Sequence, residues 1–255
     1  MQIKEFPILE FDSDKNPFIK PSGNIAPIDI AERCVLCFFS EAIENILNKH
    51  PHKIAAYFKA ESLKLPMYEL EYKGGKIALI QAGVGAPIAA GQIEELCALG
   101  CRKFIACGSC GVLREDIAVG HLIIPSAAVR DEGTSYHYIE PSREVEADAH
   151  IVREIESALA KRNVPYITAK TWTTDALYRE TQAKIKQRKA EGCVTVEMEC
   201  SAYIAAARYN NVEFGQILYA GDNLGGSEWD SRGYSRRTDI RGMVLGLALD
   251  VCMGI

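Results

Sequence analysis

The sequence predicts an α/β fold: a single domain with a central, mixed and twisted β-sheet flanked by helices. Apolar runs of strand length alternate with stretches of helical length over about two hundred residues, and this alternation is typical of a sheet covered on both faces by helices. Of the 255 residues, 48% are hydrophobic and 25% are charged, a composition that suits a globular domain with a substantial core.

The first part of the chain is expected to lie outside this domain. Residues 1–30 are rich in proline and have few periodic apolar positions, and the fragment PSGNIAP has the composition of an irregular segment. We therefore expect residues 1–30 to form an extended N-terminal arm and residues 31–255 to form the domain. Because an arm of this kind often packs on a neighbouring subunit, we expect a homo-oligomer, either a dimer or a hexamer.

The alternating strands and helices can be assigned in order along the domain. Each apolar run is too short for a buried helix and suits a strand buried on both faces. The predicted strands are 34–39, 76–85, 103–111, 121–129, 165–174 and 214–222, and the predicted helices are 41–50, 87–99, 148–163, 179–191, 199–210 and 238–253. The helix over 87–99 has both ends marked, because Pro87 begins it and Gly100 follows it.

Charge and hydropathy exclude several classes of partner. The formal net charge is -5, and acidic and basic residues are mixed along the chain, so there is no basic surface for a phosphate backbone. The N-terminus lacks the apolar run of a signal peptide, and no later run reaches the roughly 18 apolar residues of a membrane span. We expect no nucleic-acid polymer and no membrane as partner, and a cytoplasmic location.

The cysteines indicate neither disulfides nor a metal site. Their number, nine, is odd and most lie in apolar stretches, which favours reduced thiols in the core. Cys34 and Cys37 form a lone CxxC without a second ligand pair, whereas a structural zinc site normally has four ligands. We expect no metal.

Two glycine-rich loops follow predicted strands, where ligands collect in sheets of this kind. In AGVGAP, Gly83 and Gly85 let the backbone approach a ligand, and the next helix directs free amides toward it. In CGSCG, Ser109 follows Gly108, and its hydroxyl and the neighbouring amides suit an anion or a ribose hydroxyl. A tight turn is the alternative for each loop, but the recurrence of one design favours a ligand site.

Two further segments place acids where a core would not choose them. In VEMEC, Glu197 and Glu199 stand among apolar residues, and a buried carboxylate needs good hydrogen-bond donors. A vicinal diol supplies two donors, so a sugar is a natural partner for Glu199, while capping of the next helix is the alternative. In YAGDN, Asp222 and Asn223 end a strand, where an acid can transfer a proton or simply form a turn.

Taken in order, these segments resemble the nucleoside phosphorylase family, which includes bacterial hexameric purine nucleoside phosphorylases, uridine phosphorylases and the methylthioadenosine/S-adenosylhomocysteine nucleosidases. GSCG is similar to the phosphate loop of the purine enzymes, VRDEGTSYHY resembles the corresponding stretch of the uridine enzymes, and VEMEC is similar to the ribose-binding signature common to all. The resemblance implies a phosphorylase/hydrolase-like fold, no cofactor, and inorganic phosphate as co-substrate of a nucleoside.

The resemblance also implies a role for each matching position. The matching residues are Glu199, Met198 and Glu197 for the ribose, Ser109, Gly108 and Gly83 for the phosphate, and Val196, Leu177 and Tyr178 for the base. Asp222 lies where the purine enzymes and the nucleosidases keep an aspartate that protonates purine N7. The uridine enzymes lack this aspartate, so its presence favours a purine-like leaving group.

Two departures from the family concern the phosphate. The phosphorylases carry a Gly-Asp-Pro-x-Arg loop after the first strand, where this chain has SEAIEN, and an arginine where this chain has Ala106. Each missing charge-assisted contact forgoes roughly 1.5 to 3 kcal/mol. The candidates to replace these arginines are Arg33, Arg130, Arg236 and Arg237, or a neighbouring subunit.

Three hypotheses follow. The first is a phosphorylase that converts a purine nucleoside or uridine to free base and ribose 1-phosphate. The second is a hydrolytic nucleosidase, because nucleosidases carry a glutamate after the first strand, a position that Glu41 or Glu44 could fill. The third is an inactive nucleoside-binding protein.

Overall fold

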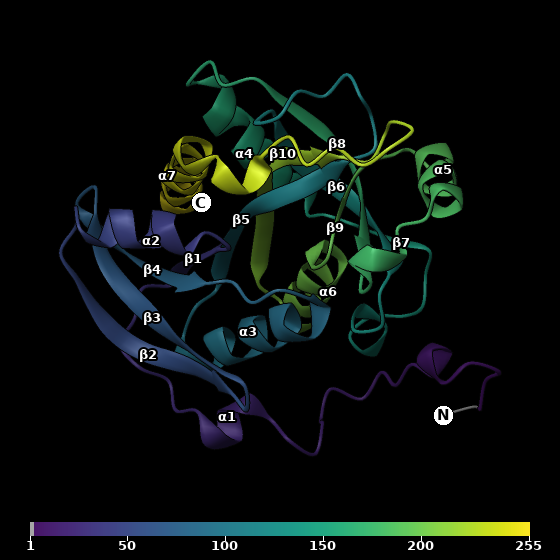
Figure 1. Ribbon diagram of the computed structural model, residues 1–255. Coiled ribbons are helices and arrows are strands. Elements are labelled where there is room, and N and C mark those ends of the chain that lie inside the picture. The colour runs from purple at the N-terminus through teal and green to yellow at the C-terminus, as the bar shows by residue number, and fades with distance from the viewer. Residues whose placement is uncertain (1–2) are drawn as a thin grey trace.

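The computed structural model describes residues 3–255 (Figure 1). The strands are β1 (Arg33–Cys37), β2 (His52–Ala60), β3 (Leu63–Tyr72), β4 (Gly75–Gln81), β5 (Lys103–Val112), β6 (Leu122–Asp131), β7 (Glu144–Glu146), β8 (Tyr166–Thr174), β9 (Cys193–Glu197) and β10 (Glu213–Asn223). The α-helices are α1 (Pro21–Asn24), α2 (Ser40–Leu47), α3 (Ala86–Leu99), α4 (Ala149–Ala160), α5 (Gln182–Ala190), α6 (Cys200–Asn210) and α7 (Thr238–Gly254). Four short 3-10 helices are η1 (Pro7–Leu9), η2 (Ser135–His137), η3 (Leu177–Arg179) and η4 (Tyr234–Arg236).

The strands form one mixed sheet, as predicted, with the order β10-β6-β8-β9-β5-β1-β4-β3-β2 and β7 paired to β6. β10 also pairs in parallel with β5, so five of the strands close into a ring. The antiparallel pairings β5–β9 and β6–β10, of two residue pairs each, complete this ring. The carboxyl ends of β1, β4, β5 and β10 therefore lie at one edge, since these strands are mutually parallel.

Helices cover both faces of the sheet (Figure 1). Ile43 of α2, Ile151 of α4 and Val244 of α7 belong to one core cluster, and Ile93 of α3 and Tyr203 of α6 belong to the other. This arrangement confirms the predicted α/β class with flanking helices. No helix within residues 3–255 is both long and apolar enough to cross a membrane.

The cysteines of the CxxC motif lie on opposite faces of β1. Cys34 packs in the cluster under α3 and α6, whereas Cys37 packs in the cluster under α2 and α7. Side chains alternate along a strand, so residues three apart cannot share a ligand. All nine cysteines are unpaired, and eight of them are buried.

Four strands, β2, β3, β7 and β9, were not predicted from the sequence, and β7 has only three residues. β2 is mostly exposed and has no clean apolar alternation, so it lacks the signal of a half-buried strand. β3 joins β4 through Lys73 and Gly74, which both adopt positive φ, the geometry of a tight hairpin turn. β9 lies in the segment that was read only as a ligand loop, because its five residues are short and polar at alternate positions.

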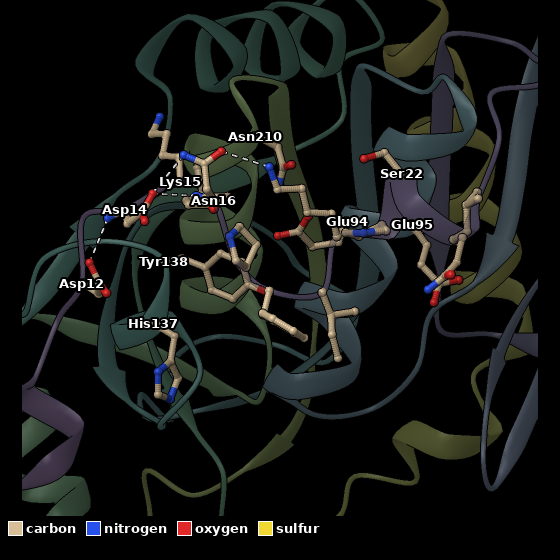
Figure 2. Close-up of a pocket in the computed structure, with 18 of the residues that line it drawn as sticks. Asp12, Asp14, Lys15, Asn16, Ser22, Glu94, Glu95, His137, Tyr138 and Asn210 are labelled. Carbon is tan, nitrogen blue, oxygen red and sulfur yellow. Dashed lines mark hydrogen bonds between the residues drawn. The ribbon is translucent and has the colours of Figure 1, made fainter.

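The N-terminal arm crosses the body below α3 (Figure 1). Its end is anchored, since the Ile28 N–H donates to Leu99 O at 3.0 Å and the Ala31 N–H donates to a Glu69 oxygen at 2.9 Å. Farther back, Phe18 is fully exposed. A cavity of about 1110 Å³ separates this part of the arm from the body. Figure 2 shows the side of this cavity that the arm forms. The hydrogen bonds drawn there join arm residues to one another, for example Asn16 to Asp14.

A substitution at Gly215 of β10 tests how closely α4 packs on the ring of strands. A Cβ at this position would lie 2.6 Å from Ile151 Cγ2 and 2.7 Å from Ile155 Cδ1. Gly215→Ala is therefore expected to lower the free energy of unfolding by about 1 to 3 kcal/mol through overpacking. The matched control is Gly246→Ala inside α7, where a Cβ meets nothing within 4 Å, and it should stabilise by about 0.5 to 1 kcal/mol. Urea unfolding of both variants measures these effects, and equal stabilities would contradict the packing.

Candidate functional site

A cavity of about 400 Å³ opens where the loops after β1, β4, β5, β9 and β10 meet. Seven of the residues predicted from the sequence line it: Ser109, Leu177, Val196, Glu197, Met198, Glu199 and Asp222. The other lining residues are Phe38, Phe39, Val84, Cys110, Gly111, Glu180, Leu218, Leu224, Tyr234 and Arg241. Within residues 3–255, no three His, Cys, Asp or Glu side chains are grouped to hold a metal ion.

The two glutamates of VEMEC have different hydrogen-bond partners. The Glu197 carboxylate accepts the N–H groups of Glu199 and Cys200, at 2.7 and 2.6 Å, and the Thr173 hydroxyl at 2.6 Å. Glu197 therefore caps the first turn of α6, which is the helix-capping role predicted from the sequence as the alternative to sugar binding. Glu199 caps nothing with its side chain, and one of its oxygens accepts the N–H of Gly85 at 2.7 Å.

Both glutamates are buried, and burial disfavours their charged forms. Burial, followed by the charge of Glu197, raises the pKa of Glu199 to about 8. Burial raises the pKa of Glu197 to about 7, although its hydrogen bonds from Thr173 and the α6 backbone oppose the rise. Glu199 is thus a carboxyl group that gains from donors that a ligand brings into the cavity.

These raised pKa values predict a pH dependence of stability. Both acids bind their protons more tightly in the folded chain than at the ordinary pKa of 4.5. Between about pH 4.5 and 8 the free energy of unfolding should therefore fall as the pH rises, by up to about 1.4 kcal/mol per pH unit for each proton. The Glu199→Gln variant has no titrating group at this position, so its free energy of unfolding, measured in urea, should fall less steeply with pH across this range. Equal slopes for variant and wild type would contradict the raised pKa of Glu199.

Asp222 is directed into the cavity by an irregularity in β10. The pairing of β10 with β5 shifts register between Ala220 and Asn223, and such bulges re-aim side chains. One Asp222 oxygen, Oδ1, would lie 3.4 Å from a Cβ at Gly111, and the other, Oδ2, accepts the Trp229 indole N–H at 2.7 Å. One oxygen is thus held while the other faces the cavity wall.

Glu180 provides a second carboxyl group near Asp222. Burial, followed by the charge of Asp222, raises the pKa of Glu180 to about 7. Val196 and Leu224 line the same part of the cavity, since both approach the Cβ position of Gly111 within 3.0 Å. This end of the cavity therefore combines an apolar wall with two acids.

Ser109 and Arg241 form the other end. Ser109 of β5 pairs in register with Tyr219 of β10. The Tyr219 hydroxyl donates to Tyr234 O at 3.0 Å and accepts from Arg241 Nε at 3.2 Å. Arg241 Nη1 donates to Glu41 Oε1 at 2.7 Å. A hydroxyl and a cation are thereby held close together by a chain of contacts.

Five candidate residues lie outside the cavity lining, and one of them, Glu41, contacts the lining residue Arg241. The Gly83 N–H donates to Gln92 Oε1 at 2.9 Å, and a Cβ there would meet Ile88 Cγ2 at 2.2 Å. Gly108 lets the Phe38 ring approach, since a Cβ there would lie 2.9 Å from it. Both glycines therefore serve packing in this chain. Tyr178 is 92% exposed and Glu44 is exposed on α2, so neither reaches the cavity.

None of the four arginines proposed to replace the missing ones lines the cavity. Arg33 Nε donates to Ile255 O at 2.9 Å. Arg130 is buried and donates to Ser135, Ser142 and the Glu140 carbonyl. Arg236 and Arg237 are exposed near η4. Within a single chain these assignments are wrong, because the guanidinium groups are used elsewhere or face solvent.

Sequence reasoning missed three functional candidates: Arg241 and Glu180, which line the cavity, and Trp229, which contacts the lining residue Asp222. Arg241 had a weak signal, as a cation preceding the apolar residues of α7. Glu180 had none, because an Arg-Glu pair in the first turn of a predicted helix usually faces solvent. Trp229 stands in a glycine-rich loop, which a backbone pairing between Asn223 and Asp230 folds back toward Asp222.

Comparison with known proteins agrees with these features. The family model described as the phosphorylase superfamily matches residues 32–245. The guanosine phosphorylase of Halorubrum lacusprofundi is 27% identical over 165 residues, which are 65% of this chain and 68% of that protein.

Two solved structures share the fold. The uridine phosphorylase of Vibrio fischeri ES114 has a TM-score of 0.75 at 23% identity, and the match covers 89% of this chain and 93% of that one. The AMP nucleosidase of Bacteroides thetaiotaomicron has a TM-score of 0.68 at 22% identity, covering 88% and 87% of the two chains. The same fold therefore carries enzymes named for different acceptors, and the residues of the site must decide between them.

Proposed function

This chain belongs to the phosphorylase superfamily, and from that premise we propose that it cleaves the N-glycosidic bond of a purine nucleoside with phosphate as acceptor. One observation carries the proposal. Four side chains meet in a single cavity. They are the carboxyl group of Glu199, which does not cap a helix, the hydroxyl of Ser109 near the cation of Arg241, and the carboxyl group of Asp222, which accepts the Trp229 indole N–H.

Glu199 is proposed to bind the ribose. Its carboxylate can accept hydrogen bonds from both hydroxyls of a vicinal diol, while the Gly85 N–H holds one oxygen in place at 2.7 Å. Met198 supplies an apolar surface for the sugar next to it. An oxocarbenium-like transition state would gain from the anionic charge of Glu199 once the diol has stabilised that charge.

Asp222 is proposed to protonate the departing base. A phosphate oxygen forms the new bond to C1′, the bond from C1′ to the base nitrogen breaks, and its electron pair stays on the base. The Asp222 carboxyl donates its proton to purine N7 and is later reprotonated from solvent, which gives the neutral base and ribose 1-phosphate. Trp229 holds Oδ2, so Oδ1 is the oxygen that carries the proton.

Hydrolysis is the second candidate, and Glu41 is the observation that favours it. Glu41 follows β1, and its carboxylate accepts a hydrogen bond from Arg241. Arg241 lines the end of the cavity that also contains Ser109, which we call the acceptor end. The lining contains four acids and one arginine, which are Glu180, Glu197, Glu199, Asp222 and Arg241. This excess of carboxyl groups suits water better than a phosphate dianion unless Arg241 is freed.

Base release from inosine, guanosine, adenosine, methylthioadenosine and uridine, each with and without phosphate, tests the proposal. Chromatography should show purine release and ribose 1-phosphate only when phosphate is present. Release of free ribose without phosphate would establish hydrolysis instead. Tight nucleoside binding without release would indicate the third hypothesis, an inactive binding protein.

We also propose that the chain is a homo-oligomer, because Phe18 of the arm is fully exposed and Ile19 is 76% exposed in a single chain. Such side chains are expected to pack on a neighbouring subunit. Light scattering should give a mass of at least two chains. Deletion of residues 1–27 should weaken association and leave the melting temperature of the domain nearly unchanged. A mass of one chain at working concentration would refute the proposal.

A further inference from the structure

The acceptor end of the cavity contains an ion pair whose two members differ in their surroundings. Arg241 lines the cavity and has 16% of its side chain exposed, whereas Glu41 does not line it and has 33% exposed. The pair joins residues 200 positions apart, from the first turn of α2 to the first turn of α7. Glu41 can therefore turn toward solvent without disturbing the cavity wall.

Arg241 itself is fixed by contacts that do not involve Glu41. Its Nε donates to the Tyr219 hydroxyl at 3.2 Å, and its guanidinium lies 5.0 Å from the centroid of the Phe39 ring. Tyr219 is held in turn by its bond to Tyr234 O. If Glu41 leaves, the cation remains beside Ser109, with Nη1 free for another acceptor.

An anion needs this cation, because Arg241 is the one Arg or Lys among the described residues that line the cavity. In the unliganded chain its charge is already matched by Glu41. The hydrogen bond from Arg241 and its charge outweigh partial burial and lower the pKa of Glu41, so Glu41 is an anion that competes for the same donor.

We propose that Glu41 is an exchangeable counter-ion of Arg241, and that an incoming tetrahedral oxyanion replaces it on Nη1. The inference rests on the proposed function, since the oxyanion is the phosphate acceptor. Glu41 then keeps the cation oriented and neutral in the empty site, and Arg241 with Ser109 forms the phosphate subsite in place of the arginines that the family's loops provide.

This role makes a prediction opposite to that of a water-activating base. If Glu41 is a counter-ion, Glu41→Gln removes a competitor and should tighten phosphate binding about threefold to tenfold, the size of a partly exposed ion pair. Turnover at saturating phosphate should remain. If Glu41 activates water, the same substitution should abolish turnover and leave phosphate affinity unchanged.

The experiment titrates inorganic phosphate into the full chain by calorimetry and measures the KM for phosphate with the best nucleoside. Variants are Glu41→Gln and Arg241→Gln, and the matched controls are Glu154→Gln and Arg153→Gln, two exposed residues of α4. We expect tighter phosphate binding for Glu41→Gln, loss of binding by about a hundredfold for Arg241→Gln, and no change for the controls. Thermal melts identify any variant that fails to fold.

Unchanged or weaker phosphate binding in folded Glu41→Gln would overturn the inference, even if the wild type performs phosphorolysis. A wild type that releases no base with phosphate would instead overturn the proposed function. The two failures are distinguishable, because the first is read from the variant's affinity and the second from the products of the wild type.

Discussion

Asp222→Asn should lower the turnover of purine nucleosides by about 10²- to 10⁴-fold, the usual size of a general-acid contribution. The amide has nearly the same shape as the carboxyl, and its oxygen can still accept the Trp229 indole N–H that now lies 2.7 Å from Oδ2. What it cannot supply is a transferable proton at N7. The expected loss is therefore chemical and should appear in kcat at saturating phosphate.

Comparing substrates that can and cannot be protonated at N7 separates the loss of proton transfer from other effects of the substitution. Uridine should be much less affected, because a pyrimidine has no N7. A purine nucleoside methylated at N7 should also be spared, since its base is already positively charged in the substrate and leaves as a neutral molecule without a proton from Asp222. Asp230→Asn is the matched control, because it removes an exposed carboxyl from the same loop. Equal losses on all substrates would point to a structural role at the end of β10, and no loss on purines would remove Asp222 from the mechanism.

Much of the architecture could be predicted because local patterns and the global fold agree. The apolar run at 103–111 became β5, and the marked helix after AGVGAP became α3 within a residue of its predicted start. The closure of the ring could not be predicted. It depends on two short pairings, β5 with β9 and β6 with β10, and no periodicity in a single strand specifies a partner that lies a hundred residues away.

The candidate site was predicted in part, for a physical reason. Acids and glycines at strand ends are visible in sequence because a core would not choose them, and Glu199 and Asp222 stood out on that ground. Arg241 and Glu180 are ordinary charged residues in ordinary positions, and only the tertiary structure brings them to the cavity. Conversely, Gly83 has the composition of a phosphate loop, but its amide is already bonded to Gln92.

Glu199→Gln is expected to lower kcat/KM for ribonucleosides by about 10²- to 10⁴-fold. Two charge-assisted hydrogen bonds to the diol, at roughly 1.5 to 3 kcal/mol each, would be replaced by a single neutral one, because the amide offers one acceptor oxygen. The same oxygen can keep the bond from the Gly85 N–H, so the α3 loop should stay in place. A 2′-deoxynucleoside should lose far less, because it offers only one of the two hydroxyls.

The pH dependence gives this prediction a second readout. In the empty cavity burial and Glu197 raise the pKa of Glu199 to about 8, whereas a bound diol donates to the charged form and lowers it again. Binding of ribonucleosides to the wild type should therefore tighten as the pH rises from about 6 to 8 and then level off, and the Gln variant should show no such rise. Nucleoside affinity measured by calorimetry at several pH values, with phosphate absent, checks both. A variant that discriminates ribose from deoxyribose as the wild type does would show that Glu199 does not bind the sugar.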